Sequence, residues 1–199
     1  GPLPPLLMRV TKRALASGDI VIRPLDKKNI KHDIAIVMDI FNDAWSHNWG
    51  FVPFTSAELE KLANDMKMLV HGDYVAIATY KGELAAMSVT LPNLNDWIDG
   101  FNGRLLPFNW IKLVKEVIAK RPHSIRMPLL GVRKKFQDSL AGSALAVSVI
   151  DHVRNYHISR GTKACEMSWI LEDNMRIRHI IEELGGIADK TYRIYGKDL

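Results

Sequence analysis

The stretch between residues 124 and 161 constrains the fold of this chain more than any other. Residues 124–132 are mostly apolar and lead to Gly131-Val132, which predicts a strand. After a polar loop, small residues open an apolar stretch with helical spacing, which predicts a helix from Gly142 to Ser159 that ends at Gly161. A strand that feeds a helix through a short loop is a building unit of α/β sheets whose faces are covered by helices.

The rest of the chain shows the same alternation of strand and helix patterns. We expect strands at 20–26, 74–80, 83–91, 163–171 and 187–195, a long loop at 92–110, and helices at 29–46, 55–70, 108–120 and 174–184. A chain of 199 residues is long enough for one substantial core. We therefore expect an N-terminal arm or linker at 1–19 and a single α/β domain at 20–199.

Composition narrows the partners and the compartment. The net charge of +5 favours an anionic partner or is a solvated face, but no helix gathers Lys and Arg as nucleic-acid readers do. The single cysteine, Cys165, allows no intramolecular disulfide and no multi-cysteine metal site, which indicates a reducing, cytoplasmic compartment. No apolar stretch approaches the roughly 20 residues that cross a bilayer. We expect that the chain binds no nucleic acid, no membrane and no metal. The sequence leaves open whether the chain forms a homodimer.

The loop before the 142–159 helix suits a phosphate group. A helix N-terminus presents unpaired amides and partial positive charge, and small residues let a ligand approach the backbone. The loop also begins with three cations, Arg133-Lys134-Lys135. The alternative is an ordinary strand-to-helix connection with solvated charges, and the loop alone does not decide between them.

The succession of elements resembles the GNAT superfamily of acyl-CoA-dependent N-acyltransferases over residues 20–199. Gln137-Asp138-Ser139-Leu140-Ala141-Gly142 is similar to the family's Gln/Arg-x-x-Gly-x-Gly/Ala loop. The helix from Asn174 to Leu184-Gly185-Gly186 is similar to the family's Asn-led helix. Residues 41–54 and 168–174 also resemble a poorly characterised branch whose members have a longer N-terminal region.

The resemblance implies a mixed, mostly antiparallel sheet whose middle strands, at 124–132 and 163–171, splay apart. Acetyl-CoA or another acyl-CoA would lie in the gap as co-substrate, and its acyl group would pass directly to the amine of a small-molecule acceptor. The residues that the resemblance implies for the cofactor are Leu130, Val132, Gln137, Asp138, Ser139, Leu140, Ala141, Gly142, Ser143, Ala144 and Asn174.

Two positions depart from the family pattern. Leu140 replaces a glycine in the phosphate loop, where a side chain restricts φ and crowds a diphosphate. Ile181 stands where many members carry a tyrosine that acts as general acid, and Gly186 stands where they carry an aromatic residue. The alternative function is therefore a degenerate GNAT-fold domain that binds CoA or a partner without turnover.

Three residues are candidates for proton transfer. Glu166 and Ser168 alternate onto one face of the predicted 163–171 strand, and burial of that glutamate would raise its pKa into the range of a general base. The alternative is a glutamate paired with Arg or Lys. Tyr195, on the predicted final strand, is a candidate acid or a packing residue.

An aromatic loop is the candidate acceptor pocket. Pockets for small molecules are mostly apolar with a few polar groups. The loop that follows the 29–46 helix has this character, with the long loop at 93–108 as its second wall. The alternative is that these aromatic residues pack an irregular region. The candidate substrate residues are Trp45, His47, Asn48, Trp49 and Phe51.

Overall fold

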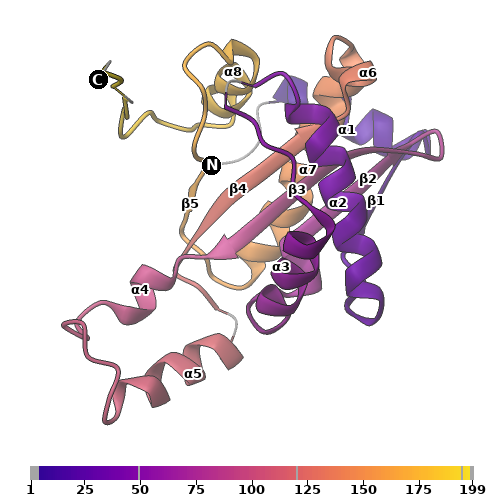
Figure 1. Ribbon diagram of the computed structural model, residues 1–199. Helices are drawn as coiled ribbons and strands as arrows, with labels where there is room; N and C mark the ends of the chain where they lie inside the picture. The colour runs from indigo at the N-terminus through magenta and orange to yellow at the C-terminus, as the bar shows by residue number, and fades with distance from the viewer. Residues whose placement is uncertain (1–4, 49, 120, 194, 198–199) are drawn as a thin grey trace.

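A computed structural model describes residues 5–48, 50–119, 121–193 and 195–197. Its centre is a five-stranded sheet in the order β1-β2-β3-β4-β5, in which β4 and β5 run parallel and the other neighbours antiparallel (Figure 1). The mixed, mostly antiparallel sheet that the resemblance implied is confirmed. The strands are β1 (Ile20–Pro24), β2 (Val75–Tyr80), β3 (Glu83–Pro92), β4 (Ser124–Val132) and β5 (Ala164–Glu166).

Helices connect the strands and cover the sheet. They are α1 (Pro5–Ala16), α2 (Ile30–Trp45), α3 (Ser56–Leu69), α4 (Leu94–Ile98), α5 (Asn109–Ala119), α6 (Lys134–Gln137), α7 (Leu140–Ser159) and α8 (Met175–Glu183), with single 3-10 turns at Lys27–Asn29 and Gly72–Tyr74. Thr55 and Glu58 cap the start of α3 reciprocally, as a capping box does, because each side chain accepts the backbone N–H of the other.

Successive side chains of a strand point to opposite faces of the sheet, so the core is divided into two clusters, one on each face. In β2, Ala76 and Ala78 belong to the cluster under α7, whereas Val75 and Ile77 belong to the cluster under α2. Leu145 on α7 and Ile40 on α2 are fully buried at the centres of these clusters. The sheet is therefore covered on both faces, as the pattern of strands and helices predicted.

The N-terminal region holds a helix that the sequence analysis did not predict. Residues 5–16 form α1, which packs beside α7. Val10 and Ala14 contact the α7 cluster, and Thr11 is buried. The apolar face of α1 thus extends the core under α7.

The prediction of two strands is wrong: one is shorter than expected, and the other is not formed by any described residue. β5 covers three residues in place of the predicted 163–171, and no described residue of 187–195 is in a strand. A strand persists only where a neighbour supplies a hydrogen-bonding ladder. Beyond Arg126, β4 carries Pro128, which has no N–H to give to that ladder. Among the described residues of 187–195 none pairs with a strand, and Ile187 and Tyr192 are exposed.

Candidate active site

The site begins where β4 and β5 part. The two strands pair only at Ser124–Ala164, Ile125–Cys165 and Arg126–Glu166. β4 then continues along β3 to Val132, while the chain after β5 leaves the sheet toward α8 (Figure 1). The predicted parting of the strands at 124–132 and 163–171 is confirmed, although β5 is the edge of the sheet and not a middle strand. It leaves backbone groups of Met127–Val132 without a strand partner on the β5 side, among the described residues.

The N-terminal end of α7 lies just beyond the C-terminal end of β4. The Ser139 hydroxyl caps α7 by accepting the N–H of Gly142 at 3.0 Å, which leaves the amides of Leu140 and Ala141 ahead of it in the first turn. A Cβ on Gly142 would lie 2.1 Å from the carbonyl oxygen of Phe136. Gly142 is therefore required by the packing of the loop against α7, a reason that differs from the predicted approach of a phosphate.

Leu140 does not disturb this helix end. It is the first residue of α7, its backbone is helical, and its side chain is 74% exposed. A helical position needs no glycine. The predicted restriction of φ at this position is wrong, because the turn that requires a special residue is at Gly142.

Other loop residues hold the loop itself. The Gln137 Nε2 donates to the carbonyl oxygen of Val132 at 2.8 Å, and Asp138 forms an ion pair with Arg176 of α8 at 2.5 Å. Ala144 is buried and Ser143 is partly buried in the first turns of α7. Asn174 caps α8, since its Oδ1 accepts the N–H of Ile177 at 3.3 Å. The side chains of Gln137 and Asn174 therefore fix the framework around the helix start.

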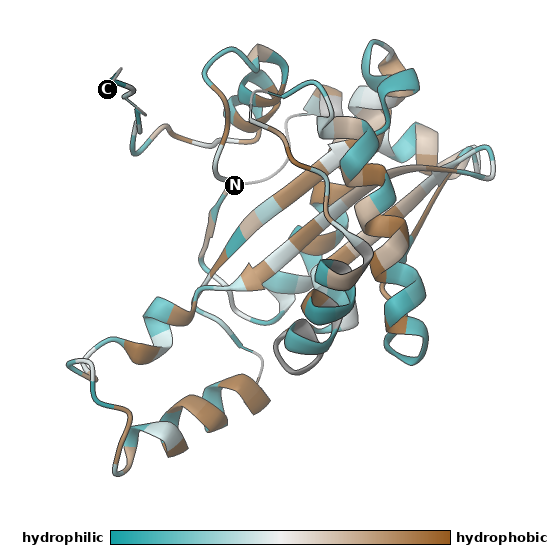
Figure 2. Cartoon of the chain, in the orientation of Figure 1, coloured by the Kyte–Doolittle hydropathy of each residue, from teal (hydrophilic) through white to brown (hydrophobic). Residues whose placement is uncertain are grey.

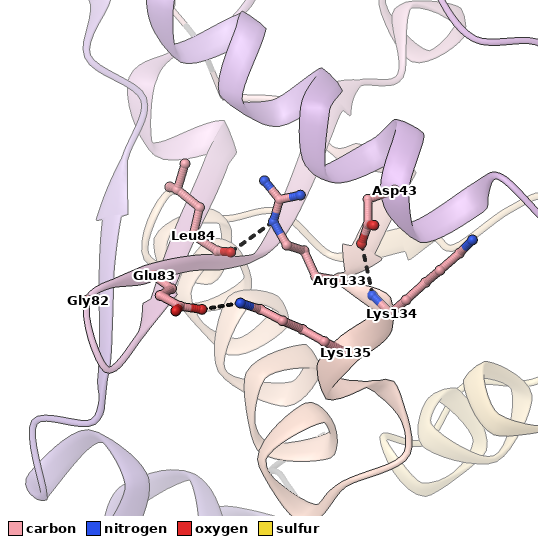
Figure 3. A pocket seen from close by; sticks show the side chains of 7 residues that line it. All are labelled: Asp43, Gly82, Glu83, Leu84, Arg133, Lys134 and Lys135. Carbon is pink, nitrogen blue, oxygen red and sulfur yellow. Dashed lines mark hydrogen bonds and ion pairs between the residues drawn. The ribbon is translucent and has the colours of Figure 1, made fainter.

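Two of the three loop cations, Arg133 and Lys135, are paired with carboxylates. Arg133 pairs with Asp39 and donates to the carbonyl oxygen of Leu84, and Lys135 pairs with Glu83. They line an open pocket of about 700 Å³ together with Asp43, Gly82 and Lys134 (Figure 3). Carboxylates in this pocket offset the cations, so it is a mixed-charge surface pocket and differs from the cationic phosphate site that the sequence suggested.

The last residue of α2, just before the aromatic loop, contacts β4. The indole Nε1 of Trp45 donates to the carbonyl oxygen of Leu130 at 3.2 Å, which brings together two residues predicted for the acceptor and the cofactor. His47 contacts Lys134 at 3.1 Å, and Asn48 is partly buried. Phe51 packs on the ring of Phe41, as the packing alternative requires. Trp49 lies outside the described residues.

A charged cluster stands at the point where the strands part. Arg126 donates to Glu166 at 3.0 Å and to the Ser168 hydroxyl at 3.0 Å, and that hydroxyl donates to Glu166 at 2.7 Å. The Arg126 guanidinium also lies 5.5 Å from the ring centroid of Trp169. The structure thus brings together the two predicted proton-transfer residues, Glu166 and Ser168, with an arginine that the analysis did not single out. Arg126 is the only charged residue of its strand, which was the available signal.

The predicted environment of Glu166 is wrong. Its side chain is 58% exposed, because β5 is an edge strand. The hydrogen bond from Ser168, followed by the charge of Arg126, lowers the pKa of Glu166 below its usual value. The ion-paired alternative is the one that the structure shows, and Glu166 is ionised at neutral pH.

Comparison with known proteins identifies the fold of this chain. No protein-family model matches the chain. It is similar in structure to an aminoglycoside acetyltransferase from an uncultured soil metagenomic sample, with a TM-score of 0.58 and 11% identity over 92% of this chain and 99% of that one. It is also similar to a putative acetyltransferase of Salmonella typhimurium solved with acetyl-CoA, with a TM-score of 0.51 and 17% identity over 84% of this chain and 79% of that one. The chain has the GNAT fold.

Two curated proteins are similar in sequence as well. The chain is 41% identical to the bacterial ceramide synthase of Caulobacter vibrioides over its whole length, and 37% identical to the protein YghO of Escherichia coli over 90% of its length. It covers 52% and 46% of these two proteins. The chain therefore spans about half the length of the curated relatives that it matches.

The departures from the GNAT pattern at α8 have a packing reason. The Gly186 N–H donates to the carbonyl oxygen of Ile181 at 2.8 Å, and a Cβ on Gly186 would lie 2.4 Å from the Ile181 side chain. An aromatic residue does not fit at position 186 while Ile181 occupies this turn. Tyr195 is 86% exposed in the C-terminal segment, so its predicted role as an acid has lost the strand on which it was based.

The part of the chain that the structure describes contains no candidate metal-binding site. No group of three or more His, Cys, Asp or Glu side chains is placed there to hold a metal ion. His157, the one fully buried histidine there, instead bonds to the Thr90 hydroxyl at 2.8 Å in the core.

Proposed function

We propose that this chain is an acyl-CoA-dependent N-acyltransferase domain that joins an acyl group to the amine of a long-chain lipid base. The divergence of β4 from β5 beside the start of α7 is the observation that carries this proposal. The finer choice of acceptor is supported by the 41% identity to a protein named bacterial ceramide synthase. Ceramide is the amide of a fatty acid with a long-chain amino alcohol.

Two open backbone regions suit the two ends of an acyl-CoA. The edge of Met127–Val132 has no strand partner on the β5 side, although the carbonyl oxygens of Leu130 and Val132 accept from Trp45 and Gln137. Its remaining backbone groups can pair with the amides of a pantetheine arm, as a strand would. The first-turn amides of α7, at Leu140 and Ala141, suit the diphosphate. With the diphosphate there, the pantetheine arm runs back along β4 and brings the thioester toward the cluster of Arg126, Glu166 and Ser168.

The reaction is a direct displacement. The neutral amine attacks the thioester carbonyl carbon and forms a C–N bond, while the carbonyl oxygen takes the negative charge. An N–H of the open β4 edge stabilises that oxyanion. The attacking nitrogen, which gained positive charge when the C–N bond formed, loses a proton to solvent. The C–S bond then breaks, and CoA leaves as a thiolate. Because thiols have a pKa of about 8.5, the thiolate needs no strong acid, which fits isoleucine at position 181.

The ionised Glu166 attracts the acceptor. An aliphatic ammonium has a pKa of about 10, far above that of a carboxylate whose pKa is lowered, so Glu166 is not a strong base toward it. The bonds from Arg126 and Ser168 both end on Glu166 Oε1, so its Oε2 instead accepts the ammonium at the point where the strands part, and Ser168 holds the carboxylate in place. The proton of the ammonium passes to solvent, and the amine that remains is the nucleophile.

The test is a matrix of donors and acceptors. The purified chain is incubated with acetyl-CoA or palmitoyl-CoA and with a long-chain amino alcohol or a panel of small amines, while free thiol and amide products are measured. The proposal predicts amide formation from palmitoyl-CoA and the long-chain amine. Turnover of small amines alone would retain the acyltransferase and refute the lipid acceptor.

The same preparation tests the non-catalytic alternative, which Ile181 still motivates. Stabilisation of the chain by CoA in thermal unfolding, without thiol release for any pair, would support a binding domain. If no acyl-CoA stabilises the chain, both functions are contradicted.

A further inference from the structure

A helical arm extends from the body of the molecule. It comprises residues 93–121, between the end of β3 and the start of β4, and contains α4 and α5 (Figure 1). Asp96 anchors its base, because its carboxylate accepts the backbone N–H of Ser124 at 2.9 Å and the hydroxyl at 2.6 Å. Ser124 is the first residue of β4 and lies two residues before Arg126. The arm is thus attached beside the point where the strands part.

The arm has a small core of its own. Trp97 and Phe101 are buried, and the Lys112 ammonium lies 5.5 Å from the ring centroid of Phe101. The Asn109 side chain donates to the carbonyl oxygen of Arg104 at 2.6 Å, just before α5 begins. These contacts orient α5 relative to α4.

One face of α5 is apolar and uncovered. Trp110, Val114 and Ile118 are four residues apart, so they share one side of the helix, and all three are exposed. Leu106 and Phe108, just before the helix, are each 73% exposed. No described residue of α5 is buried. Figure 2 shows apolar residues recurring along this helix, away from the sheet.

Positive charges border this apolar face. Lys115 is exposed on α5 at about 100° around the helix axis from the centre of this face, and Arg104 and Arg121 are exposed before and after the helix. Lys112 lies on the opposite side, over the ring of Phe101. Residues 93–121 carry five Lys and Arg against three Asp and Glu. A helix with Trp and aliphatic residues on one face and cations at its flanks has the composition of helices that lie in the interface of anionic membranes.

We propose that the arm binds the surface of an anionic bilayer, with Trp110, Val114 and Ile118 in the boundary between headgroups and acyl chains. The mode is peripheral, since no described helix is both long and apolar enough to cross a membrane. No membrane was expected from the sequence, because no apolar stretch in it approaches the length that crosses a bilayer. The purpose of this membrane binding rests on the proposed function. A long-chain amine resides in a bilayer, and the arm places that bilayer beside the point where β4 and β5 part.

Vesicle flotation without any acyl-CoA tests the binding separately from catalysis. The chain is mixed with vesicles of phosphatidylcholine alone or with a quarter of phosphatidylglycerol. It is expected to float with the anionic vesicles and to be released as salt is raised, because surface charges are screened. Ile118→Asp is expected to reduce binding at least tenfold. Ile158→Asp, at an isoleucine that is 53% exposed on α7, is the matched control and keeps binding.

Circular dichroism confirms that both variants are folded. The proposal is overturned if the chain does not float with anionic vesicles, or if Ile118→Asp and Ile158→Asp float alike. It is also overturned if the chain self-associates in solution, Ile118→Asp makes it monomeric and neither form floats. That result would assign the apolar face to a second copy of the chain.

Discussion

Helices α5 and α7 are both rich in apolar residues, yet their surroundings are opposite. α7 has ten buried residues and crosses one face of the sheet, whereas no described residue of α5 is buried. The apolar residues of α7 lie all around the helix, as in helices enclosed by a core, and those of α5 favour one side. The difference teaches that apolar content alone does not build the core. Where the chain attaches each helix to the sheet decides whether it stabilises the fold or presents a surface.

The largest expected effect separates the two helices by stability. Leu145→Ala in α7 should cost about 2–5 kcal/mol, because it removes a fully buried side chain and leaves a cavity. Ile118→Ala in α5 should change the free energy of unfolding by less than about 0.5 kcal/mol, as exposed sites do. Urea unfolding measures both. Equal losses would show that α5 is packed in solution.

The core beneath α7 should also be sensitive to acid. Burial lowers the pKa of His157 to about 4, because the charged ring would lose water. The unfolded chain then binds more protons between pH 6.5 and 4, so stability falls as the pH drops through this window, by about 3 kcal/mol at most. Unfolding free energies measured from pH 7 to 4 check this. His157→Gln should flatten the decline, whereas His179→Gln on the exposed side of α8 should leave it unchanged.

The cluster where the strands part should affect activity more than stability. Glu166→Gln keeps the shape but removes the charge that attracts an ammonium, so kcat/KM should fall about 10- to 100-fold, or roughly 1.4–2.8 kcal/mol. The melting temperature should change little, because the side chain is largely exposed. Steady-state kinetics with a long-chain amine measure the loss. An unchanged kcat/KM would remove Glu166 from the site.

The smallest expected effect concerns the start of α7. Ala141→Asp puts a negative charge beside the proposed diphosphate and should weaken CoA binding about tenfold, or roughly 1.4 kcal/mol. The same charge suits a helix N-terminus, so the fold should keep or gain stability. Ala141→Asn is the neutral control of the same shape. Gly142→Asp is unsuitable, because its side chain would strike the Phe136 carbonyl and unfold the loop.

Features that depend on neighbours in the chain were predicted from the sequence, whereas features that depend on distant residues were not. Caps and periodicity located most elements, including the start of α3 at Thr55 and the stop of α8 at Gly185, because these depend on neighbours in the chain. The exposure of Glu166 was missed, since it depends on β5 being an edge. The parting of β4 from β5 was expected from resemblance alone, because no local pattern reports which strands become neighbours.

The arm and the charged cluster show a second reason why part of the structure could not be predicted from the sequence. The 92–110 stretch was predicted as a loop from its Gly and Pro residues, and the short helix α4 within it is held by the distant Ser124. Arg126 belongs to the cluster only because Glu166 and Ser168, which lie 40 and 42 residues further along the chain, are brought beside it. Contacts of this kind come from the topology, which single positions do not encode.

Hydrogen exchange of backbone amides, measured with and without CoA, tests the central claim most directly. The account predicts slower exchange in the β4 segment 127–132 and in the first turn of α7, with α5 unchanged. Protection confined to the pocket around Gly82–Leu84, or no protection along β4 and α7, would contradict it.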